Sequence, residues 1–122
     1  MATRVKAKVT VLADGVRIIE WAGLLNTDDG EWSVVPFPGD KCVHAYGTFG
    51  AAGTVTIQGT NETGAPAQGQ TLHDPAAAVL TLTDAAGARL KQCLESPYQI
   101  RPVVTAGDGT TNLTVRLCVV GR

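Results

Sequence analysis

The amino-acid sequence predicts an all-β fold, a single-domain antiparallel β-sandwich, on three observations. Segments in which apolar and polar residues alternate recur about eight or nine times, and a period of two is typical of strands with one buried face. Fourteen glycines punctuate these segments, as turns require. The 122 residues fit one domain, residues 1–122, and no segment has convincing helical periodicity.

The N-terminal segments predict a β-hairpin. Apolar residues occupy the odd positions of 5–11 and polar residues the even ones, which indicates a strand with one dry face. Asp14-Gly15 favours a tight turn. The return strand is expected over residues 16–23, with Ile19 and Trp21 on one face.

The next segments predict a loop and three strands. Residues 26–30 form a polar turn that lacks the ligand spacing of a calcium loop. A short strand at residues 32–35 ends at Pro36. Two alternating runs follow, 41–46 and 53–59, and the glycines between them indicate two strands and their turn.

The middle of the chain contains a long loop and one ambiguous segment. Residues 62–75 are rich in Gly, Ala, Gln, Thr and Pro, and predict either a surface excursion with a role such as a contact arm or a locally mobile loop. Residues 79–84 alternate as a strand and turn at 85–87. In residues 89–95, Leu90 and Leu94 have helical spacing, but the neighbouring strands favour a strand here too.

The C-terminal segments predict two further strands around a turn at residues 107–109. The first, 98–105, contains Pro102, which favours a sheet edge or a bulge because proline cannot donate to the ladder. The second, 110–120, alternates most regularly. Together the strands predict a core that includes Trp21, Trp32, Val55, Ile57, Leu80, Leu82, Leu117 and Val119.

Charge and composition exclude several classes of function. Ten basic and eleven acidic residues give a net charge of −1 without a basic cluster, so we expect no nucleic-acid partner. The N-terminal segment lacks the apolar run of a signal peptide, and no window approaches the about 20 apolar residues of a membrane span. We therefore expect synthesis in a cytoplasm and no membrane partner.

Potential catalytic and metal-binding residues are few. His73-Asp74 are adjacent on a loop, where neighbours seldom face one another, and no activated nucleophile motif accompanies them. Cys42 and His44 share a strand face, but two ligands do not complete a zinc site. The three cysteines, at wide spacing, are expected to be small buried or half-buried residues. We expect no catalytic residues, no metal and no cofactor, hence no enzyme.

Turn and strand residues also occur in a distinctive order over residues 40–120. The segments are 46–50, 53–61, 72–75, 80–83, 94–97, 98–102 and 107–111. In this order and spacing the chain resembles small structural proteins of tailed bacteriophages, namely head decoration or cement proteins. The resemblance implies a β-sandwich, with the jelly roll as one topology open to it, that forms a small homo-oligomer, a dimer or trimer, on the capsid exterior of a virion. It would bind the major capsid protein and stabilise the expanded head by mass action and avidity.

Two elements are the first candidates for contact with such a partner: the N-terminal run 1–8 and the loop 62–75. The candidate contact residues are Thr3, Arg4, Lys6, Glu62, Pro66, Gln68, Gln70 and His73. A neck, tail or baseplate component would share the same all-β composition. A carbohydrate-binding module is a further alternative, which exposure of both tryptophans on one flat face would favour.

Overall fold

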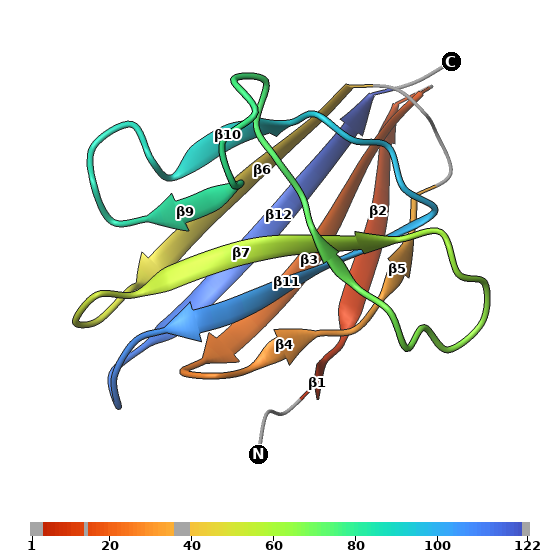
Figure 1. Cartoon of the computed structure of the whole chain (residues 1–122). Coiled ribbons are helices and arrows are strands. Elements are labelled where there is room, and N and C mark those ends of the chain that lie inside the picture. Colours follow the sequence, from red (N-terminus) through yellow and green to blue (C-terminus); the bar gives the residue numbers. More distant parts are fainter. Residues whose placement is uncertain (1–3, 14, 36–39, 121–122) are drawn as a thin grey trace.

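The computed structural model describes residues 4–13, 15–35 and 40–120, and within them strands form two sheets that pack face to face (Figure 1). The five-stranded sheet has the order β10-β6-β12-β3-β2. Its strands are β2 (Ala7–Ala13), β3 (Val16–Leu25), β6 (Asp40–Thr48), β10 (Leu90–Cys93) and β12 (Asn112–Val120). The seven-stranded sheet has the order β1-β4-β11-β7-β8, with β5 also on β11 and β9 also on β7. Its strands are β1 (Arg4–Val5), β4 (Asp29–Gly30), β5 (Ser33–Val34), β7 (Thr54–Thr60), β8 (Gln70–Thr71), β9 (Thr81–Thr83) and β11 (Gln99–Ala106).

The predicted all-β sandwich is confirmed, and its topology is that of a jelly roll. From β3 onward the chain passes between the sheets, so that the order β3-β12-β6-β10 faces the order β4-β11-β7-β9. β2 extends the five-stranded sheet beyond this pattern. The pairs are antiparallel, apart from the short parallel pair of β1 with β4. No helix that could span a membrane occurs among the described residues.

The core lies between the two sheets and confirms most of the predicted buried residues. β12 alternates as expected, with Leu113, Val115, Leu117 and Val119 each at most 1% exposed. The prediction for Trp32 is wrong: its side chain is only half-buried, and the Arg101 guanidinium lies 4.6 Å from its ring centroid. The other predicted core residues are buried: Trp21, Val55, Ile57, Leu80, Leu82, Leu117 and Val119.

The strands predicted at 41–46 and 53–59 form, but they belong to different sheets. β6 pairs with β10 and β12, whereas β7 pairs with β11, β8 and β9. The segment between them is thus a corner of the sandwich. Gly50 has φ +74°, and a Cβ at Gly53 would lie 2.0 Å from the Phe49 carbonyl oxygen, so both positions need glycine. The Thr111 hydroxyl donates to that carbonyl (2.8 Å) and fixes the corner.

The N-terminal hairpin is confirmed, but its expected dry face is only partly buried. β2 pairs with β3, with a register shift between Val11 and Ala13, and Val5 and Ala7 pack against the core. Val9 and Val11 are 52% and 63% exposed, and they lie on β2, an edge strand of the five-stranded sheet. Alternation reveals a strand but does not reveal whether another layer covers it.

The ambiguous segment and the proline-containing strand have also taken defined positions. Residues 90–93 form the strand β10, as the neighbouring strands favoured. Of the two positions predicted for the strand with Pro102, the sheet edge is wrong, because β11 pairs on both sides, whereas the pairing of β11 with β7 does shift register between Val104 and Ala106. Val104 N–H donates to Asp28 (2.8 Å), so the Pro102 nitrogen, two residues earlier, faces the same side. There β4 ends at Gly30 and β5 begins at Ser33, and this break accommodates the missing donor.

Candidate functional site

A surface hollow of about 410 Å³ lies between the loop that contains β8 and the connection from β10 to β11. It brings together residues that are distant in the sequence, and these include Gln70 and His73 from the predicted contact loop. The lining residues are Gly59, Thr60, Asn61, Gln70, Thr71, Leu72, His73, Glu95, Ser96 and Pro97.

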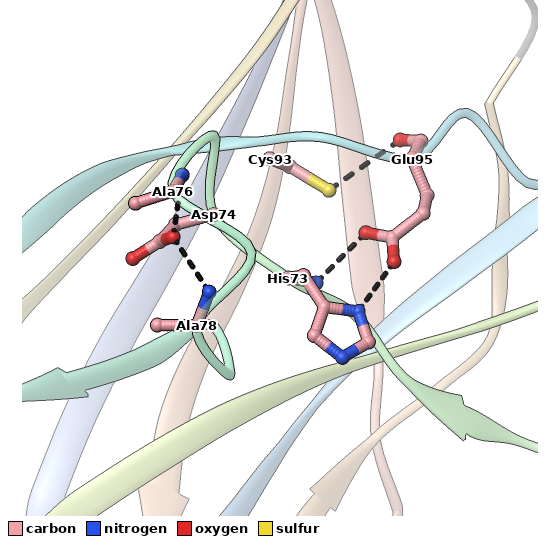
Figure 2. A network of polar contacts seen from close by, with 6 residues as sticks. All are labelled: His73, Asp74, Ala76, Ala78, Cys93 and Glu95. Carbon is pink, nitrogen blue, oxygen red and sulfur yellow. Dashed lines mark hydrogen bonds and ion pairs between the residues drawn. The ribbon is translucent and has the colours of Figure 1, made fainter.

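A short polar contact in this hollow joins His73 and Glu95 (Figure 2). One Glu95 carboxylate oxygen accepts the main-chain N–H of His73 at 2.7 Å, and the other lies 2.6 Å from His73 Nδ1. The main-chain N–H of Leu94 also donates to the His73 carbonyl (2.9 Å). These bonds attach the loop 62–75 to the β10–β11 connection.

The carboxylate of Glu95 is held in its charged form. Burial would raise the pKa of Glu95, but the hydrogen bonds from the His73 side chain and main chain outweigh it, and the pKa is lowered. The His73 and Glu95 side chains are 41% and 36% exposed, so water reaches the pair. The site can therefore accept a hydrogen bond or a cation from a partner at its rim.

The relay considered for His73 and Asp74 does not form. Asp74 Oδ1 accepts the main-chain N–H groups of Ala76 (2.9 Å) and Ala78 (3.1 Å), and its carboxylate points away from the imidazole in Figure 2. Asp74 therefore stabilises its own turn. Sequence reasoning missed Glu95 as the partner of His73, because no local pattern links residues 22 positions apart.

A second contact lies behind the hollow. Lys41 is 1% exposed at the start of β6, and its Nζ donates to Ser96 Oγ at 2.7 Å. Burial lowers the pKa of Lys41. Cys93 is also buried, its thiol lies 3.5 Å from the Glu95 carbonyl oxygen, and burial raises its pKa to about 11.

The Lys41–Ser96 contact brings together the residue types of a Ser–Lys catalytic pair. A catalytic lysine accepts the serine proton and must be neutral to do so. Here the amine nitrogen and the hydroxyl oxygen lie 2.7 Å apart, and Lys41 is buried. The arrangement therefore supplies a polar partner for a shielded amine, which would be costly to leave without one.

The rest of the loop 62–75 is also fixed by hydrogen bonds. The Glu62 carboxylate accepts the N–H groups of Ala67 (3.1 Å) and Gln68 (2.6 Å), which closes the tip of the loop. The Gln99 side chain donates to the carbonyls of Glu62 (3.0 Å) and Gly64 (3.2 Å). The predicted surface excursion is thus a loop with a defined shape.

The predicted contact residues do not form one surface. β1, which contains Arg4, and β8, which contains Gln70, are at opposite edges of the seven-stranded sheet. Lys6 and Gln68 are exposed, and Pro66 is half-buried. Thr3 lies outside the described residues. The loop 62–75 and the N-terminal run are thus separate candidates for contact.

The other potential site residues lie on the outer face of the five-stranded sheet. His44 is exposed and packs against Tyr46, with ring centroids 5.0 Å apart. Cys42 is half-buried. Among the described residues, no group of three or more His, Cys, Asp or Glu side chains could hold a metal ion.

Comparison with solved structures shows a similarity to the crystal structure of the SPBc2 prophage-derived protein YomS. The TM-score is 0.58 at 12% sequence identity, and the match covers 92% of this chain and 100% of that one. At this identity the similarity shows a shared fold. No family model and no curated protein matches the chain.

Proposed function

We propose that the chain is a structural protein of a phage virion: a head decoration, or cement, protein that binds the outer surface of the capsid shell and stabilises the expanded head. The observation that carries this proposal is the loop 62–75, whose shape is fixed by Glu62, Gln99 and the His73–Glu95 pair. A loop ordered before binding costs less conformational entropy when it meets a partner. Its partner would be the major capsid protein.

The fold and the sequence pattern support a phage origin. The sequence of residues 40–120 resembles decoration proteins, and the fold is similar to that of a prophage-derived protein. We expect the chain to be made in the bacterial cytoplasm and to assemble on the capsid exterior as a dimer or trimer. Several linked copies on a symmetric shell would combine weak individual contacts into a higher overall affinity.

We expect this role to need no catalysis. The exposed carboxylate and imidazole at the hollow and the Lys41–Ser96 contact all serve to hold loops to the sandwich. A neck, tail or baseplate protein would use the same architecture and is the alternative within the virion. A sugar-binding role has less support, because Trp21 is buried and the Trp32 ring is covered by Arg101.

Binding to purified capsids tests the proposal. Capsids of the phage that encodes the chain, prepared without it, are incubated with the protein as expanded heads and as unexpanded procapsids, and bound protein is measured by co-sedimentation. We expect binding to expanded heads alone, with a raised temperature of capsid disruption. Equal binding to both shells, or binding to neither, would contradict the cement role.

Two variants locate the contact. Glu62→Ala removes the acceptor for Ala67 and Gln68 and loosens the loop, so it should bind expanded heads more weakly than the wild type. Asp84→Ala removes an exposed carboxylate on the β9–β10 turn and is the matched control, expected to bind normally. Normal binding by Glu62→Ala would move the contact away from this loop.

A further inference from the structure

Two cysteines face each other across the centre of the five-stranded sheet. Cys42 of β6 and Cys118 of β12 are direct register partners, so their side chains project from the same face of the sheet. Both are half-buried, and both line a hollow of about 300 Å³ together with Gln92 and Val120. Cys93, the third cysteine, is buried on β10.

The position of the pair in the ladder sets the separation of the two residues. Ala45 N–H donates to Arg89 (2.9 Å), so odd residues of β6 direct their main-chain groups towards β10 and even residues towards β12. Cys42 and Cys118 are therefore a hydrogen-bonded pair, for which the Cα atoms are about 5.5 Å apart. This separation lies inside the range of about 4.4–6.8 Å that a disulfide bridges.

We propose that Cys42 and Cys118 are a site of reversible oxidative modification, at which a small-molecule disulfide such as oxidised glutathione converts the two thiols into a cross-strand disulfide. One cysteine thiolate attacks the glutathione disulfide, forms a mixed disulfide and releases one reduced glutathione. The second cysteine then displaces the other glutathione, so two cysteine thiols are oxidised to one disulfide and one glutathione disulfide is reduced to two thiols, which take up the two protons that the cysteines lose.

The surroundings of the pair predict that the bond is labile. Directly opposed Cβ atoms lie about 4.5–5.5 Å apart, whereas a disulfide needs about 3.5–4.5 Å, so closure draws β6 and β12 together. A bond under such tension is readily reduced. Burial, together with the adjacent Cys118, raises the pKa of Cys42, so the reaction should accelerate as the pH rises. This inference does not depend on the proposed virion role.

The test uses the folded full chain, reduced and then incubated with oxidised glutathione in mildly alkaline buffer. Free thiols are alkylated, and intact mass and peptide mapping identify the bond. We expect the mass of a single chain that has lost two hydrogen atoms, with Cys42 linked to Cys118 and Cys93 alkylated. The thermal midpoint should rise on oxidation and return on reduction, because the bond closes a long loop of the unfolded chain.

Three serine variants separate the outcomes. Cys93→Ser is the matched control and should form the bond as the wild type does. Cys42→Ser and Cys118→Ser should instead retain one glutathione or an unmodified thiol. The proposal is overturned if the folded wild type stays reduced while the urea-unfolded chain oxidises in the same buffer. A bond that includes Cys93, or a disulfide between chains, would overturn it as well.

Discussion

The contact between His73 and Glu95 gives the most specific test of the site, through the substitution Glu95→Gln. The variant has the same size and can still accept the His73 main-chain N–H, but it loses the charge that strengthens both bonds. Hydrogen bonds to a charged group contribute about 1.5–3 kcal/mol each when shielded. The Glu95 side chain is 36% exposed and the His73 side chain is 41% exposed. Water therefore reduces this contribution towards the value for surface ion pairs, which is about 0.2–1 kcal/mol. We expect a loss of about 1 kcal/mol, or about 3–5 °C in the thermal midpoint of a domain of this size.

The same variant has a predicted pH dependence. The folded-state pKa of Glu95 is lowered below its ordinary value of 4.5, so the unfolded chain binds the proton more readily. The stability that Glu95 supplies is thus fully present above about pH 4.5 and is lost as the pH falls through the lower, folded-state pKa. The difference between wild type and Glu95→Gln should shrink over that acidic range.

Urea unfolding followed by tryptophan fluorescence, at several pH values, measures both effects. Asp84→Asn is the control, because the Asp84–Arg89 pair is 66% and 52% exposed and should contribute about 0.5 kcal/mol or less. Equal stability of Glu95→Gln and the wild type at neutral pH would refute the reasoning. A difference that persists unchanged in acid would show that it arises from packing instead of charge.

Two further predictions concern the core and the Lys41–Ser96 contact. Gly30→Ala should cost about 1–3 kcal/mol in urea unfolding, because its Cβ would lie 2.6 Å from Pro102 Cδ and 2.7 Å from Trp21 Cδ1; an unchanged midpoint would contradict this packing. A fluorophosphonate probe, which labels activated serines, should leave Ser96 unmodified in the folded chain at neutral pH, because we expect Ser96 to be a structural partner of the buried Lys41 amine. Labelling of Ser96 that disappears in Lys41→Met would instead indicate a catalytic pair.

Much of the fold is predictable because burial in a sandwich follows a period of two. β12 and β9 have their apolar residues inward, as alternation requires. Alternation identifies a strand and its two faces, but it does not identify the neighbours of the strand. For this reason the sequence did not reveal that β6 and β7 lie in different sheets, or that the odd face of β2 is open at Val9 and Val11.

Less of the site is predictable, because its contacts join residues far apart in the sequence. The long loop was evident from composition, and His73 and Gln70 do line the hollow. The partners Glu95 and Ser96 follow β10 in an otherwise ordinary connection, and no spacing rule links them to His73 or Lys41. The loop 62–75, the start of β6 and the β10–β11 connection meet only because the chain passes repeatedly from one sheet of the jelly roll to the other.

A substitution in the β10–β11 connection can therefore distinguish a loss of stability from a loss of the proposed binding. It contacts β6 of the five-stranded sheet through Ser96 and the loop 62–75 through Glu95. If that loop binds a capsid, Glu95→Gln should weaken binding by freeing the loop, even when nearly all molecules remain folded. A domain with several kcal/mol of stability stays folded after losing about 1 kcal/mol. If the variant binds more weakly while it is still fully folded, the loop belongs to the interface. If binding falls only as the chain unfolds, the His73–Glu95 contact is purely structural.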